Sequence, residues 1–433
     1  MSPYTIKVFF ILVCSCLLMP EITNARINNL FGGLSIREGY DSNIYRTNKD
    51  EVSGWATSIS PTLSFNSQGK NDTLSFSYGP RFSYDHKSKK KHVDHELDLI
   101  GDKNFTKTFH AAVRETYIRS SNTYLEQQVL IDQVLLLKDY NKTNRLWTNT
   151  VSLQTDYTYG PGGVFRLGYT NHILKQLTTQ ANNSPNNEYV RHNPSTSLSY
   201  RFNNYWGMLA SYRYVRGDFD NAPDLETHNP GLRLNYLYSP KTTFFGHYGY
   251  SKTDYTGNLR PSNKTQSVGF GTDHEIDPQT NISFFAGFSR ADKKTASRDA
   301  FNYGLNLTKK LQKGSLRIDG NGGFDQADFD GTNFGLSRYW SLKGYLDYQL
   351  TEKSKLNAYL EYRNDKYLNQ IPTAKENAYS GGGGYSFVFA RWYTISFQYG
   401  YLQVNGDNSA SAKDYIDHRF YVALGAAKEL WRW

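Results

Sequence analysis

Apolar and polar side chains alternate along most of the chain with a period of two. In residues 392–402, one face would carry Tyr393, Ile395, Phe397, Tyr399 and Tyr401. The opposite face of this stretch would carry Thr394, Ser396, Gln398 and Gly400. A second stretch repeats the pattern with Trp340, Leu342, Leu346, Tyr348 and Leu350. A period of two over about ten residues predicts tilted strands long enough to cross a membrane.

The connections between these strands alternate between short and long. Short polar connections are expected at 69–72, 104–107, 160–163, 203–204, 239–242, 277–280, 312–315, 351–354 and 390–391. Longer ones are expected at 45–53, 86–94, 120–144, 175–188, 218–226, 254–263, 291–297, 325–331, 366–375 and 406–414. Short periplasmic turns and long outer loops are typical of bacterial outer-membrane barrels. The pattern predicts an all-β fold, a transmembrane antiparallel up-and-down barrel of about 20 strands, within roughly 18–22.

Composition supports the barrel over a set of soluble domains. Tyr (35), Phe (25) and Gly (35) are abundant and the mean hydropathy is −0.66, so large aliphatic cores would be hard to build. After the N-terminal region, no segment approaches the roughly 20 apolar residues of a spanning helix. A closed barrel is then the way to cross a bilayer, because every backbone polar group must be paired internally. The alternative is a soluble β-solenoid or a surface protein of several β-sandwiches.

Residues 1–25 have the features of a cleaved secretory signal. Lys7 precedes the apolar run 8–19, and Thr23 and Ala25 are small residues at the positions that precede a cut. The barrel domain is therefore expected to comprise residues 26–433. A lipoprotein signal, cut before Cys14 or Cys16, is disfavoured by the bulky Val13 and by the apolar run that continues beyond Cys16. Both cysteines of the chain lie in this signal, so the exported chain would hold no disulfide.

The C-terminus and the first strand each carry a family resemblance. Trp431 and Trp433 close an alternating strand, and such an ending resembles the signal that outer-membrane proteins of Gram-negative bacteria present to the barrel assembly machinery. Residues 33–45, GLSIREGYDSNIY, resemble the opening of the putative β-barrel porin family. Some members of that family accompany exopolysaccharide export systems. The resemblance implies an outer-membrane location in contact with lipid and lipopolysaccharide, and export of an exopolysaccharide as one possible role.

Candidate catalytic and metal sites are weak. The triplet His86-Lys87-Ser88 matches an H-x-S pattern of lipid deacylases, but it falls in a lysine-rich loop. Residues 325–331 hold three carboxylates near a glycine without the other ligands of a calcium loop, so a solvated hairpin tip is expected there. Asp417-His418 is expected to be a surface pair. No enzyme activity, cofactor, metal or nucleic-acid partner is predicted.

Charge on the face opposite the apolar one is the most informative chemical signal. If the apolar face meets lipid, the lumen would be lined by the cations Arg37, Arg81, Arg114, Arg166, Arg201, Arg213, Arg233, Arg317, Lys343 and Arg363. Fewer acids share this face: Asp41, Asp98, Asp156, Asp273, Glu275, Asp319, Asp347 and Glu361. With a net charge of +9, such a lumen would favour anions. The alternative is that these charges pair across strands and brace the barrel.

Two classes of function remain open. The first is a porin-like conduit for anionic solutes or for an acidic exported polysaccharide. The second is a structural, assembly or adhesive barrel with a plugged lumen and no transport. The connection 120–144 is rich in aliphatic residues between Val129 and Leu137. We expect it to pack on other loops, to constrict the mouth of the barrel, or to bury itself against a partner subunit.

Overall fold

The computed structural model describes residues 26–120, 146–160, 162–176, 188–220, 222–258, 260–293, 297–326, 328–329, 335–368, 374–407 and 414–433. The expected signal and the connection 120–144, apart from Ser120, lie outside these residues. Among the described residues, no helix is long and apolar enough to span a membrane.

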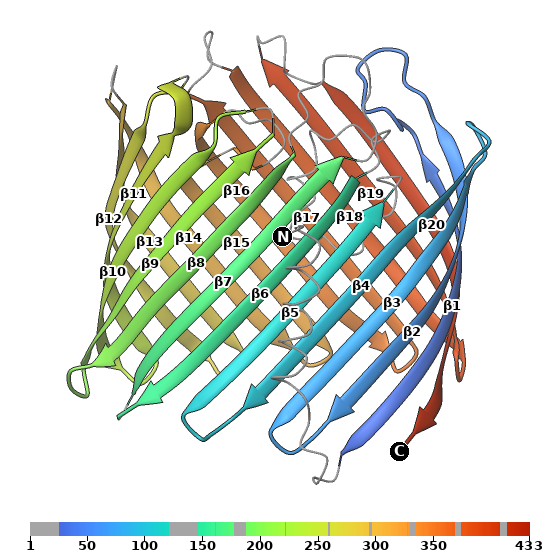
Figure 1. Cartoon of the computed structure of the whole chain (residues 1–433), viewed down its shortest axis with the longest axis horizontal. Helices are drawn as coiled ribbons and strands as arrows, with labels where there is room; N and C mark the ends of the chain where they lie inside the picture. Colours follow the sequence, from blue (N-terminus) through green and yellow to red (C-terminus); the bar gives the residue numbers. More distant parts are fainter. Residues whose placement is uncertain are drawn as a thin grey trace, which may run out of the picture.

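In the described part of the chain, twenty antiparallel strands form one sheet (Figure 1). The first ten are β1 (Ile27–Asp41), β2 (Gly54–Gln68), β3 (Asp72–Asp85), β4 (Lys90–Asn104), β5 (Phe109–Ser120), β6 (Leu146–Tyr159), β7 (Gly163–Gln176), β8 (Tyr189–Arg201), β9 (Trp206–Phe219) and β10 (Leu225–Ser239). The other ten are β11 (Thr242–Tyr255), β12 (Asn263–Asp277), β13 (Thr280–Lys293), β14 (Ser297–Leu311), β15 (Gly314–Gln326), β16 (Leu336–Thr351), β17 (Ser354–Tyr367), β18 (Ala374–Ala390), β19 (Tyr393–Asp407) and β20 (Tyr415–Arg432). One short 3-10 turn, η3 (Thr256–Asn258), follows β11.

Each strand pairs with its neighbours in sequence, and β1 also pairs with β20, which closes the barrel. At this seam the Asn28 N–H donates to the Trp433 carbonyl at 2.9 Å, and the Trp433 N–H donates back at 3.1 Å. Inside the seam, Nε of Arg419 on β20 lies 3.5 Å from a carboxylate oxygen of Asp41 on β1. The predicted up-and-down barrel is confirmed, and its strand number falls inside the predicted range.

The two ends of the barrel differ in their connections. At the lower end in Figure 1, where β1 begins and β20 ends, the strands are joined by short turns such as 240–241 and 312–313. The upper end has the longer connections, so it is the extracellular end. The predicted connection 86–94 was too long, because β4 already begins at Lys90. Lysines can occupy a strand that projects beyond the bilayer, since water still solvates them there.

The strand registers separate an apolar outer face from a polar inner face. Leu342 lies opposite Tyr362, and Leu424 lies opposite Ile395 and Ile36, so large apolar side chains share the outer face. Leu342 is 50% exposed although it is apolar, as a lipid-facing residue would be. The residues predicted to face lipid all lie on this face: Tyr393, Ile395, Phe397, Trp340, Leu342 and Leu346.

Ion pairs brace the inner face between β15 and β1. The pairs are Arg317–Asp319 at 2.7 Å, Lys343–Glu361 at 2.7 Å, Lys355–Asp347 at 3.1 Å, Arg363–Asp325 at 2.9 Å, Arg363–Asp365 at 2.7 Å and Arg419–Asp417. Several of the carboxylates, including Glu361 and Asp417, are almost completely buried. The bracing interpretation of the inner charges therefore describes this wall, which we call the braced wall. Asp417 is not the surface residue that the sequence led us to expect, because its side chain points inward to Arg419.

Deletion of Trp433 should lower the yield of inserted barrel, because it removes two hydrogen bonds of the closing seam and the contact between the Trp433 and Phe65 rings. The amount of heat-modifiable, folded protein in outer-membrane fractions measures this. Trp392→Ala, which removes an exposed tryptophan from a short turn, is the matched control. Folded barrel at wild-type levels after the deletion would contradict the prediction.

Lys343→Met should destabilise the barrel by about 2 kcal/mol, because it leaves the nearly buried Glu361 carboxylate without its cation. Arg201→Met is the control, since the described residues offer Arg201 no ion pair, and it should change stability by less than about 0.5 kcal/mol. Urea unfolding of the refolded barrel in detergent micelles compares the two variants. Equal unfolding midpoints would show that the Lys343–Glu361 pair does not brace the wall.

Candidate functional site

The strand registers put all ten predicted cations on the inner face. These residues are Arg37, Arg81, Arg114, Arg166, Arg201, Arg213, Arg233, Arg317, Lys343 and Arg363. The eight acids expected beside them also lie on this face. The structure does not bring the cations together in one cluster. Four belong to the wall from β7 to β10, four belong to the braced wall with Arg37 at its edge on β1, and Arg81 and Arg114 lie on β3 and β5.

Five adjacent strands, β7 to β11, carry no carboxylate at any inner-facing position. Their inner positions hold five arginines and two histidines, which are Arg166, Arg191, Arg201, Arg213, Arg233, His172 and His247. The remaining inner positions of these strands are mainly Ser, Thr, Asn and Gly, with apolar residues near the extracellular end. We call this surface the cationic wall.

Below its extracellular end, the described carboxylates that pair with the cationic wall come from the strands that flank it. Asp156 on β6 accepts two hydrogen bonds from Arg166, at 2.6 and 3.1 Å. Asp273 on β12 pairs with Arg233, whose guanidinium also lies 3.6 Å from the centre of the Phe245 ring. No described carboxylate lies within ion-pair distance of Arg191, Arg201 or Arg213. In the part of the chain that the structure describes, the arginines in the middle of the wall therefore form no ion pair.

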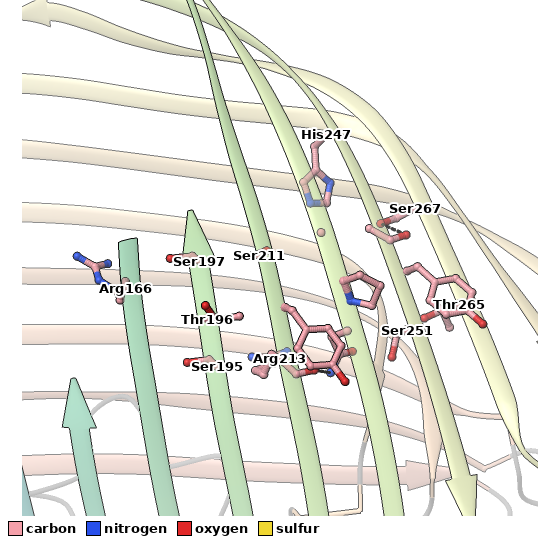
Figure 2. Close-up of a pocket in the computed structure, with 16 residues that line it drawn as sticks. Arg166, Ser195, Thr196, Ser197, Ser211, Arg213, His247, Ser251, Thr265 and Ser267 are labelled. Carbon is pink, nitrogen blue, oxygen red and sulfur yellow. Dashed lines mark hydrogen bonds between the residues drawn. The ribbon is translucent and has the colours of Figure 1, made fainter. Parts of the chain in front are cut away.

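A hollow of about 440 Å³ lies on the cationic wall (Figure 2). Arg166, Arg213 and His247 supply its basic groups. The inner-facing hydroxyl and amide groups around them come from Ser195, Ser197, Ser211, Asn229, Ser251, Thr265 and Ser267. Guanidinium groups bind carboxylate, sulfate or phosphate, and hydroxyls can both donate to and accept from a sugar. The lining suits a solute that carries negative charge and hydroxyl groups.

A second hollow of about 380 Å³ continues along the same wall toward the short-turn end. Arg201, Arg233 and Asn235 line it together with the turn at 203–205. Along β8, Arg191 lies near the extracellular start of the strand and Arg201 at its periplasmic end. Basic groups therefore follow the wall over the full length of the strands.

At the extracellular end, Asp328 and Phe329 reach the cationic wall from between β15 and β16. The Phe329 ring centre lies 5.2 Å from that of Tyr189 and 5.3 Å from that of Phe219. Asp328 accepts hydrogen bonds from Arg260 and from the Tyr255 hydroxyl, each at 2.9 Å. Burial raises the pKa of the Asp328 carboxyl. The expected solvated hairpin tip at 325–331 is thus wrong for Asp328, which is almost completely buried.

Two residues of this site were missed from the sequence. Arg191 stands at an inner position of β8, but its strand begins next to a long polar connection, so the alternation is hard to place there. Phe329 lies between two strands, where period two gives no information. Its one signal was an aromatic residue among the carboxylates of 325–331. Among the described residues, no group of three or more His, Cys, Asp or Glu could hold a metal ion.

No protein-family model matches the chain, and no curated protein matches it. Solved structures do resemble it. A mutant of the ferric enterobactin receptor PfeA from Pseudomonas aeruginosa has a TM-score of 0.50 at 10% identity, covering 92% of this chain and 80% of the receptor. OpdK from the same organism, solved with vanillate, has a TM-score of 0.42 at 11% identity, covering 92% of this chain and 99% of OpdK.

OpdO from Pseudomonas aeruginosa has a TM-score of 0.44 at 12% identity, covering 93% of this chain and 98% of OpdO. At such identities the likeness concerns the fold alone, and of these three structures PfeA has the TM-score that supports it. The sheet described above is closed and apolar on its outer face, as a lipid-embedded barrel must be. The chain therefore has the fold of an outer-membrane β-barrel.

Proposed function

We propose that the barrel is a passive conduit that favours anions. The observation that carries this proposal is the cationic wall, five neighbouring strands with five inner arginines and no inner carboxylate. Inside a wall of low dielectric constant, unpaired positive charge raises the local concentration of anions. Arginine keeps this charge at any physiological pH, because its guanidinium is not deprotonated.

The proposed mechanism is stepwise passage along the cationic wall. Arg213 is the arginine of the larger hollow that has no ion pair among the described residues, and Arg201 has the same property in the smaller hollow. An anion would exchange its water for one guanidinium, and hydroxyl groups would replace the rest of its hydration. Both hollows are open to the lumen, so each site would bind weakly and release the solute to the next.

Two substrate classes fit this mechanism. Small anions need only the arginines, whereas an acidic polysaccharide would also use the hydroxyl-bearing side chains around Arg213. The resemblance of residues 33–45 to a family with members in exopolysaccharide export favours the polymer. A barrel of about twenty strands is wide enough for water and an extended sugar chain unless it is plugged.

Replacing Arg201 and Arg213 together by Ser should lower the anion-to-cation permeability ratio by about threefold or more, since one unit charge a few ångströms from an ion is worth about 1 kcal/mol even in water. Reversal potentials in a salt gradient across a planar bilayer measure the ratio. Arg216→Ser with Arg290→Ser is the control, because both arginines lie on the outer face and the change in net charge is the same.

A cation-selective wild-type barrel would contradict the proposal, and so would an effect of the outer-face control as large as that of the inner pair. Absence of conductance in the wild type would favour the alternative function, a structural or adhesive barrel with a plugged lumen.

A polyanion should block the pore if the substrate is an acidic polysaccharide. We expect oligogalacturonate to interrupt single-channel currents, and neutral dextran of similar length to interrupt them at least about tenfold less often, because each unit charge near the wall adds about 1 kcal/mol of attraction. The Arg201→Ser, Arg213→Ser variant should lose the difference between the two polymers. Equal block by both polymers would restrict the proposal to small anions.

A further inference from the structure

The contacts of Phe329 cross the lumen. Phe329 lies between β15 and β16, whereas its ring contacts Tyr189 of β8 and Phe219 of β9. Five strands, β10 to β14, separate β9 from β15 along the sheet. A side chain that contacts both regions has to reach across the interior of the barrel, because strands so far apart are not neighbours in the sheet.

The surface that receives Phe329 is apolar, unlike the rest of the cationic wall. It consists of Leu174, Tyr189, Val215, Phe219 and Leu225, all buried, and Phe329 packs on them. Gly217 leaves room for the ring, because a Cβ at that position would lie 2.7 Å from the end of the Phe329 ring. The Phe329 ring can therefore pack against the wall because Gly217 has no side chain.

Asp328 anchors the same segment at a second point. Nη1 of Arg260 donates to one carboxylate oxygen at 2.9 Å, and the Tyr255 hydroxyl donates to the other at 2.9 Å. Arg260 comes from the connection between β11 and β12, and Tyr255 ends β11. The segment is therefore held by one apolar and one charged contact, on strands that are not adjacent to its own.

Arg191 lies directly beneath this segment. Its guanidinium carbon is 4.6 Å from the centre of the Phe329 ring, and its buried Nε has no hydrogen-bond partner among the described residues. Along the wall toward the periplasm, the next arginine is Arg213 in the larger hollow. A solute that enters from outside along the cationic wall therefore meets Arg191 first.

We infer that Asp328 and Phe329 form a latch that narrows the extracellular end of the lumen, and that Arg191, held against this latch, is the specificity-determining cation at the entrance. This inference rests on the proposed function for its selectivity part, whereas the narrowing stands on the cross-lumen contacts alone. The ligand class is an anion small or thin enough to pass the latch, such as a carboxylate on an extended chain. The latch and Arg191 act together, since the guanidinium carbon lies 4.6 Å from the centre of the Phe329 ring.

The first experiment loosens the latch from both sides. Phe329→Ala removes the ring, and Gly217→Val fills the space that the ring occupies from the opposite wall. Both variants should raise single-channel conductance in planar bilayers to a similar degree, by about one-half or more. Gly344→Ala is the matched control, because an added Cβ there has no heavy atom within 4 Å, and it should leave conductance unchanged.

The second experiment tests Arg191. Arg191→Gln should lower the anion-to-cation permeability ratio about threefold. Arg191→Lys, which keeps the charge, should retain most of the selectivity, and Arg216→Gln on the outer face should have no effect. Heat-modifiable migration on gels verifies that every variant is folded before it is measured.

The outcomes separate this inference from the proposed function. If the wild type is anion-selective but Phe329→Ala and Gly217→Val leave conductance unchanged, the latch is wrong and the proposed function stands. If the wild type is cation-selective yet both variants conduct more, the latch stands and the proposed function is wrong. If the wild type does not conduct but Phe329→Ala does, the latch is a plug. If neither the wild type nor Phe329→Ala conducts, the inference is overturned.

Discussion

Every other feature of this protein depends on the need to pair all backbone N–H and C=O groups inside a bilayer. A sheet with two free edges cannot satisfy this need, because each edge would leave unpaired groups in lipid. Pairing of β1 with β20 removes both edges. Closure also fixes which side chains face inward, since side chains alternate along each strand and the register carries this alternation to the next strand. The set of side chains that line the lumen is therefore fixed once β1 and β20 pair.

The alternation made the barrel and its two faces predictable from the sequence. Arg213 and Arg233 could be assigned to the inner face because the apolar side chains at alternate positions of their own strands mark the opposite, outer face. The position of Phe329 could not be predicted in this way, because it depends on a contact between residues that are 140 apart in sequence and belong to no common strand pair. The length of the connection 86–94 was overestimated because β4 begins at Lys90. Beyond the membrane, water solvates polar side chains on a strand, so the alternation of apolar and polar residues no longer marks where the strand ends.

The two interpretations of the inner charges each describe one wall. Between β15 and β1, basic and acidic side chains are paired, and the burial of Glu361 would be costly without Lys343. From β7 to β11 the arginines have no inner-facing acid on their own strands, and the ion pairs seen among the described residues come from the flanking Asp156 and Asp273. One wall thus contributes cohesion, and the other leaves charge available at the surface of the lumen.

The separation of charge between the walls gives the lumen an electric field that points across it, perpendicular to the direction of transport. A solute inside would experience a torque as well as an attraction. Its negative end would turn toward β7–β11, and its uncharged side would slide along the paired charges opposite. Two isomers of equal size and net charge would then travel in different orientations and at different speeds. The barrel would distinguish molecules by the position of their charge.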